Sequence, residues 1–162
     1  MLSESRFDEV IKNCQALIRE KSYSGQEGDV VKAIEKIMKS YQFDDIHVDK
    51  YGNIIGGIIG NKPGKTLVLD GHIDTVPVNE EKWSRNPYGG DIEGDKMYGR
   101  GTCDMKSGLA AMVIAMIELH EEGADFRGRI RLLATVGEEV GELGSEQLTK
   151  EGYVDDVTSM II

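Results

Sequence analysis

Two short, mostly apolar runs, Thr66–Leu69 and Ile130–Val136, constrain the fold more than any other feature of the chain. Runs without polar alternation are typical of strands buried on both faces, as in parallel sheets covered by helices. Between them, residues 106–121 are apolar on most sides at helical spacing. The alternation of helices and strands predicts an α/β domain with a mixed, mostly parallel sheet and helices on both faces.

The remaining segments add further helices and strands. Helical periodicity predicts helices over 6–20 and about 30–41, and Ser24 with Glu27 has the pattern of a capping box for the second helix. Other patterns predict strands at 46–48, 53–59 and from 158 onward, a turn at 61–64, and a short helix within 141–152. By length, 162 residues correspond to one domain.

Composition excludes some classes of function. The net charge of −10 argues against nucleic-acid binding, which needs a basic surface. Two cysteines, Cys14 and Cys103, are too few for a disulfide framework and fit a reducing, cytoplasmic compartment. The N-terminus has no pattern of a signal peptide. The most apolar run, Leu109–Ile117, suits a buried helix better than a membrane span, so we expect no membrane partner.

His72 and Asp74 directly follow the first apolar run, where functional groups of open α/β sheets gather. Residues two apart in extended backbone point to the same side, so this imidazole and carboxylate are expected to meet. Such a carboxylate commonly orients a metal-binding histidine. A loop histidine beside an unrelated aspartate is the alternative interpretation.

Carboxylates follow two other elements. Asp104 lies between a glycine-containing segment and the helix at 106–121, as a metal ligand or as an ordinary helix N-cap. Glu138 and Glu139 follow the second apolar run, where one can bind metal while the other acts as a base, or both form a solvated acidic loop. Oxygen and imidazole donors without thiolate favour catalytic zinc, cobalt or manganese.

Three motifs in order carry a resemblance to a known family: Gly71-His72-Ile73-Asp74-Thr75-Val76-Pro77, then Tyr98 to Gly108, then Glu138-Glu139 followed by Gly144-Ser145. They resemble the M20 family of metallopeptidases, which includes glutamate carboxypeptidases, acetylornithine deacetylases and succinyl-diaminopimelate desuccinylases. The resemblance runs from about Phe7 to the last residue and implies a zinc-exopeptidase-like catalytic domain. Gly137 stands where members often carry aspartate, which leaves the subfamily open.

The resemblance implies a role for each residue. His72 would bind one of two divalent ions, zinc first among the candidates, and Asp74 would orient it. Asp104 would bridge both ions, with a cis peptide bond after it. Glu139 would bind the second ion. Glu138 would be the general base that activates a metal-bridging water for amide hydrolysis.

The resemblance also implies missing parts. The chain stops inside an apolar run, and members of the family are longer, with a further acidic ligand, a late histidine ligand and a lid domain that mediates homodimerisation. We therefore interpret residues 1–162 as the N-terminal part of the catalytic domain, without the lid and the C-terminal part, and expect this fragment to be inactive. Lys106 is expected to be a first-turn surface residue.

The leading hypothesis is a cytoplasmic metallohydrolase that cleaves the amide bond of a small peptide or an N-acyl amino acid. Aminopeptidase, carboxypeptidase, dipeptidase and deacylase activities all remain open. The alternative is a non-catalytic binding or interaction module that retains the fold, although His72, Asp74, Asp104, Glu138 and Glu139 are all present.

Overall fold

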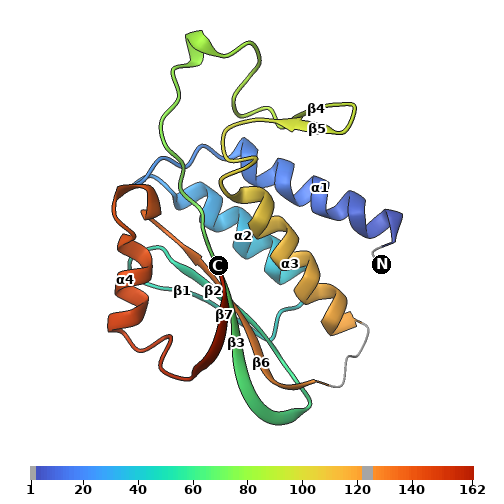
Figure 1. Cartoon of the computed structure of the whole chain (residues 1–162), viewed down its shortest axis with the longest axis vertical. Helices are drawn as coiled ribbons and strands as arrows, with labels where there is room; N and C mark the ends of the chain where they lie inside the picture. The colour runs from blue at the N-terminus through green and yellow to red at the C-terminus, as the bar shows by residue number, and fades with distance from the viewer. Residues whose placement is uncertain (1–2, 122–125) are drawn as a thin grey trace.

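The computed structural model describes residues 3–121 and 126–162 (Figure 1). Its helices are α1 (Glu4–Arg19), α2 (Gly28–Ser40), α3 (Lys106–Glu121) and α4 (Leu143–Lys150), with short 3-10 turns η1 (Glu80–Lys82) and η2 (Glu138–Val140). Its strands are β1 (Asp45–Val48), β2 (Ile54–Ile59), β3 (Lys62–His72), β4 (Asp91–Glu93), β5 (Lys96–Tyr98), β6 (Arg127–Thr135) and β7 (Val157–Ile161).

Five strands form one sheet in the order β1-β2-β6-β3-β7. The pairs β1–β2 and β2–β6 are antiparallel, whereas β6–β3 and β3–β7 are parallel. Every strand except β2 therefore runs in the same direction, which confirms the mixed, mostly parallel sheet. Strands β4 and β5 form a separate antiparallel hairpin that the sequence patterns did not predict.

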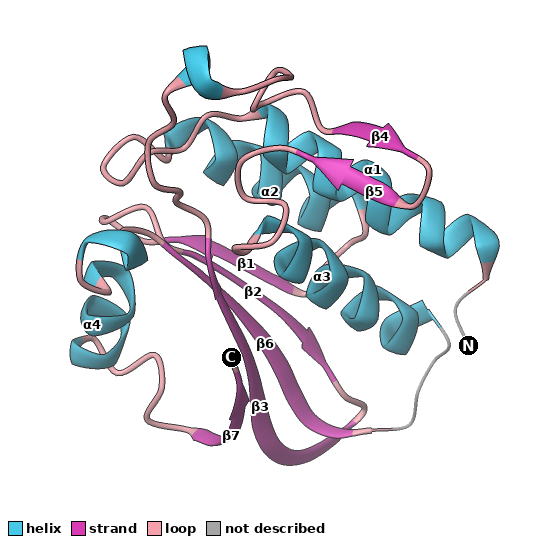
Figure 2. Cartoon of the chain, turned by 45° about the horizontal axis from the view of Figure 1, so that its top comes forward, coloured by secondary structure: helices cyan, strands magenta, loops and turns pink. Residues whose placement is uncertain are grey.

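The sheet is buried on both faces because helices cover each of them. Helices α1, α2 and α3 gather on one side of the sheet (Figure 2), where Ile54, Leu132 and Ile114 share one apolar core. On the opposite face, Leu133 packs with Leu148 of α4. Adjacent residues of β6 thus point into cores on opposite faces of the sheet. This is why the apolar run of β6 does not alternate with polar residues. Helices on both faces are confirmed.

Two local predictions are wrong. Pro63 and Gly64 lie inside β3 and not in a turn, because the strand continues through a register shift between Lys62 and Thr66. Ser24 does not cap α2, whose N-cap residue is Glu27 without a side-chain hydrogen bond. The Ser24 hydroxyl instead donates to Asp74, a contact that local sequence spacing does not encode.

Lys106 also differs from the prediction. Its side chain is 1% exposed, and its Nζ donates to the carbonyl oxygens of Leu17 (2.9 Å) and Glu20 (2.8 Å) at the end of α1. Burial lowers the pKa of Lys106 to about 8. The residue therefore ties the start of α3 to the end of α1, because the last carbonyls of a helix lack intrahelical donors.

In the part of the chain that the structure describes, no helix combines the length and the apolar character needed to cross a membrane.

Candidate metal centre

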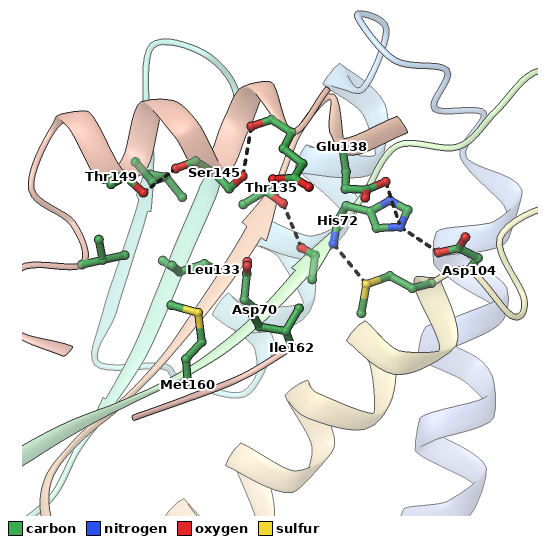
Figure 3. A pocket seen from close by; sticks show the side chains of 15 residues that line it. Asp70, His72, Asp104, Leu133, Thr135, Glu138, Ser145, Thr149, Met160 and Ile162 are labelled. Carbon is green, nitrogen blue, oxygen red and sulfur yellow. Dashed lines mark hydrogen bonds and ion pairs between the residues drawn. The ribbon is translucent and has the colours of Figure 1, made fainter. Parts of the chain in front are cut away.

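The parallel pairing of β3 and β6 brings two functional segments together. His72, the last residue of β3, stands opposite Thr135, the last residue of β6. Because both strands end at the same edge of the sheet, the chain leaving β3 reaches Asp74 beside the chain leaving β6, which forms η2 with Glu138. Asp104 reaches the same place from the segment before α3 (Figure 3).

The imidazole of His72 lies at the centre of this group. Its Nε2 is 2.8 Å from Oδ1 of Asp104 and 3.8 Å from Oε2 of Glu138 (Figure 3). Ligand-capable atoms of His72, Glu138 and Glu139 all lie within 4.8 Å of one another. The carboxylates of Asp104, Glu138 and Glu139 thus all lie close to this imidazole.

Asp74 holds the group from behind and is fully buried. Its Oδ1 accepts a hydrogen bond from the backbone N–H of Glu138 (3.1 Å), and its Oδ2 accepts from the N–H of Glu139 (3.2 Å) and from the hydroxyl of Ser24 (2.6 Å). The Nδ1 of His72 lies 3.0 Å from the Asp74 carbonyl oxygen and 3.4 Å from Oδ1. With Nδ1 occupied, Nε2 is the nitrogen that faces Asp104 and Glu138.

Charge pairing explains the pKa values. Burial opposes the imidazolium form, but the contacts with Asp74 and Asp104 outweigh it and raise the pKa of His72 to about 9. Burial likewise opposes the ionised form of Asp74. Hydrogen bonds from His72, Ser24 and the two N–H groups prevail and lower the pKa of Asp74 below its usual value.

The donor set fits a divalent transition metal. One imidazole nitrogen and several carboxylate oxygens converge, and the carboxylate of Asp74 supports the second ring nitrogen as in many zinc sites. The side chains of Asp104 and Glu138 are 74% and 44% exposed, so they line an open pocket of about 500 Å³ and not the core. This accumulation of negative charge beside one imidazole is what a cation would neutralise.

All five residues named from the sequence come together here. The peptide bond between Asp104 and Met105 is cis, as the resemblance implies. Their individual roles stay predictions. Sequence reasoning missed the role of Ser24, because a helix-capping box already explained the presence of a serine there. Such a local pattern cannot reveal a hydrogen-bond partner 50 residues away, which is Asp74.

Comparison with known proteins agrees with this geometry. Residues 68–162 match the family model described as peptidase family M20/M25/M40. A probable succinyl-diaminopimelate desuccinylase of Staphylococcus epidermidis is 37% identical over 150 residues, covering 90% of this chain and 36% of that relative. An N-formyl-4-amino-5-aminomethyl-2-methylpyrimidine deformylase of Halalkalibacterium halodurans is 39% identical over 94 residues, 57% of this chain and 22% of that relative. The chain thus spans about a third of the length of the first curated relatives it matches.

Solved structures share the fold. An M20 family metallo-carboxypeptidase from Sulfolobus solfataricus has a TM-score of 0.81 at 22% identity, over 99% of this chain and 37% of that one. A dinuclear metal-binding peptidase of the M20 family from Bacillus subtilis has a TM-score of 0.77 at 18% identity, over 98% of this chain and 43% of that one. Fold, motif order and sequence similarity agree, and the chain belongs to peptidase family M20/M25/M40.

Proposed function

We propose that residues 1–162 are the N-terminal part of a catalytic domain that hydrolyses an amide bond in a small peptide or an N-acyl amino acid. The observation that carries the proposal is that His72, Asp104 and Glu138 line one pocket, with a carboxylate oxygen of Glu139 within 4.8 Å of ligand atoms of His72 and Glu138 and with Asp74 buried behind them. Relatives named as a desuccinylase and a deformylase, and solved structures named as peptidases, support amide hydrolysis at the level of the family.

In this proposal, His72, Asp104 and Glu139 hold two divalent ions, zinc foremost, with cobalt and manganese as alternatives. Bound divalent ions supply Lewis-acid charge that polarises a carbonyl and makes water more acidic. Glu138 takes a proton from the attacking water and returns it to the leaving nitrogen. Its half-exposed carboxylate lines the pocket, which is where a base must reach both groups.

Asp74 keeps His72 in the tautomer that leaves Nε2 free for a cation. Asp74 also accepts hydrogen bonds from the backbone N–H groups of Glu138 and Glu139. It therefore fixes the backbone of the proposed base, Glu138, together with that of the proposed ligand, Glu139. A cytoplasmic location and a homodimer formed through a lid domain belong to the same proposal for the longer protein.

The test is Glu138→Gln in a form of the protein that contains the remaining catalytic domain. Metal content should stay near that of the parent, while hydrolysis of N-acyl amino acids and dipeptides falls by a factor of about 100 or more, as for loss of a general base. Unchanged turnover would refute the mechanism. A parent protein that binds metal but hydrolyses no amide would favour the non-catalytic alternative.

A further inference from the structure

The segment from the end of β6 to the first turn of α4, residues 136–144, carries both Glu138 and Glu139 and is called the carboxylate loop below. Its ends meet: the N–H of Gly144 donates to the carbonyl oxygen of Val136 at 2.9 Å. Between them, Gly137 and Gly141 have left-handed backbone conformations, with φ of +65° and +113°. In the described structure these residues belong to η2, to the start of α4 and to the turns beside them, so hydrogen bonds and contacts with other segments hold the loop in shape.

A fully buried side chain from a distant strand connection closes the base of this loop. Oδ1 of Asn53 accepts a hydrogen bond from the N–H of Val136 at 3.0 Å, and its Nδ2 donates to the carbonyl oxygen of Gly144 at 3.3 Å. A Cβ atom on Gly144 would lie 2.2 Å from Oδ1 of Asn53. The side-chain amide of Asn53 thus bonds to both ends of the loop, and it packs so closely against Gly144 that no side chain fits there.

Asp49 fixes the orientation of that amide. Its Oδ2 accepts from Nδ2 of Asn53 at 2.8 Å, and its Oδ1 accepts from the backbone N–H of Asn53 at 2.9 Å and of Tyr51 at 2.8 Å. An ionised carboxylate only accepts hydrogen bonds, so the amide must turn its NH₂ toward Asp49 and its oxygen toward Val136. A buried pair of this kind is costly unless every polar atom has a partner.

We propose that Asn53, oriented by Asp49, is a positioning residue that sets the placement of Glu138 and Glu139. This inference rests on the proposed function of those two glutamates. Asp74 holds their N–H groups on the side of His72, and Asn53 holds the base of the carboxylate loop on the other side. Removing either support frees the loop to place its carboxylates away from the ring.

The experiment compares Asn53→Asp, Asn53→Leu and the exchange Asp49→Asn/Asn53→Asp in the 162-residue chain. The first replaces the NH₂ that faces Asp49 by an oxygen, so two carboxylates repel each other. The exchange restores one amide and one carboxylate at the same pair of positions. Thr66→Val is the matched control, because it removes a hydrogen bond to Asp156 (3.0 Å) from a buried side chain near the middle of β3.

Two quantities are measured for each variant: backbone hydrogen exchange of the carboxylate loop without metal, and zinc affinity by competition with a chelator. We expect Asn53→Asp and Asn53→Leu to speed exchange at Glu138 and Glu139 and to weaken zinc binding by about 10- to 100-fold, as for loss of a residue behind the ligands. The Asp49→Asn/Asn53→Asp exchange should recover part of the parent's slow hydrogen exchange and zinc affinity, because it removes the repulsion but leaves the carbonyl oxygen of Gly144 without its donor. Thr66→Val should leave both quantities near the parent values.

Parent-like exchange and zinc affinity in Asn53→Asp would overturn the inference. The inference would also fail if Thr66→Val, at the same loss of stability, changed loop exchange and zinc affinity as much as Asn53→Asp does. General destabilisation would then explain the effects of both substitutions. If the parent chain binds no zinc but exchange changes as expected, the positioning role stands and the expectation that this chain alone holds zinc fails, whereas the proposed function fails only if the longer protein hydrolyses no amide.

Discussion

The hydroxyl of Ser24 donates a 2.6 Å hydrogen bond to Oδ2 of Asp74, across 50 residues of sequence. Hydrogen bonds to a buried charged group contribute about 1.5–3 kcal/mol. We expect Ser24→Ala to lower the free energy of unfolding by about that amount, measured by urea denaturation. Ser40→Ala is the control, because the Ser40 hydroxyl is exposed and donates only to the carbonyl of Ile37. Equal losses in both variants would contradict a special role for the Ser24 contact.

Zinc should stabilise this chain. A ligand that binds only the folded state at 100 times its dissociation constant adds about 2.7 kcal/mol to the free energy of unfolding. We expect zinc to raise the free energy of unfolding of the parent by about this amount and that of His72→Ala very little. Thermal denaturation with and without zinc measures the change. His47→Ala, an exposed histidine on β1, should respond as the parent does. A lost response in His47→Ala would place the ion elsewhere.

Lys106→Met should lower the free energy of unfolding by about 1–3 kcal/mol, since the carbonyl oxygens of Leu17 and Glu20 then lose the buried and part-buried hydrogen bonds that Nζ donates. Lys12→Met, at an exposed position of α1, should change it little. Guanidinium denaturation curves measure both. A Lys106→Met chain as stable as the parent would mean that relief of the buried charge compensates fully.

Acid should remove the contribution of Asp156. Arg131 donates to it at 2.8 Å and holds the pKa of the Asp156 carboxyl below its usual value. A lowered folded-state pKa gives stability that is present above the unfolded pKa, near 4, and is lost as the pH falls through the folded value. Because Asp156 is half exposed, Asp156→Asn should cost at most about 1 kcal/mol at pH 7.

The difference in the free energy of unfolding between the parent and Asp156→Asn should then shrink toward zero as the pH falls below the usual carboxyl pKa, in urea denaturation at a series of pH values. A difference that is independent of pH would show that the ion pair is not its source.

Gly144→Ala should be destabilising by about 1–3 kcal/mol, because the new Cβ would meet the carbonyl oxygen of Val136 at 2.6 Å as well as Asn53. Gly28→Ala, at the first residue of α2, has no neighbour within 4 Å and should be neutral or stabilising. Melting temperatures of the two variants give the comparison. A Gly144→Ala protein that melts with the parent would show that the base of the carboxylate loop can widen.

Much of the fold was predictable because burial leaves a local trace. The buried strands β3 and β6 and the helix α3 appear in the sequence as apolar runs and apolar periodicity. The hairpin β4–β5 was missed because its strands are three residues each, with β4 exposed and β5 at most half-buried, so they leave no pattern of burial in the sequence. Chain order alone did not reveal that β6 lies between β2 and β3.

The site was predictable where its residue types are unusual at strand ends, as for His72 and Asp74. Supporting residues were not, because a hydrogen-bond partner is chosen by tertiary structure. Ser24 and Lys106 each had an adequate local explanation, a cap and a surface lysine, and both were wrong. Asn53 was visible only as the start of a strand.

The position of β6 has a consequence for synthesis on the ribosome. Strands β2 and β3 are nearly consecutive in sequence, yet β6, made about seventy residues later, is inserted between them. Until β6 arrives, Asp74 has no N–H groups of Glu138 and Glu139 to accept, and the nascent chain has no place for a cation. Only chains in which β6 has paired between β2 and β3 would then bind a metal ion at the proposed site. Metal binding would therefore report directly that the sheet has finished folding.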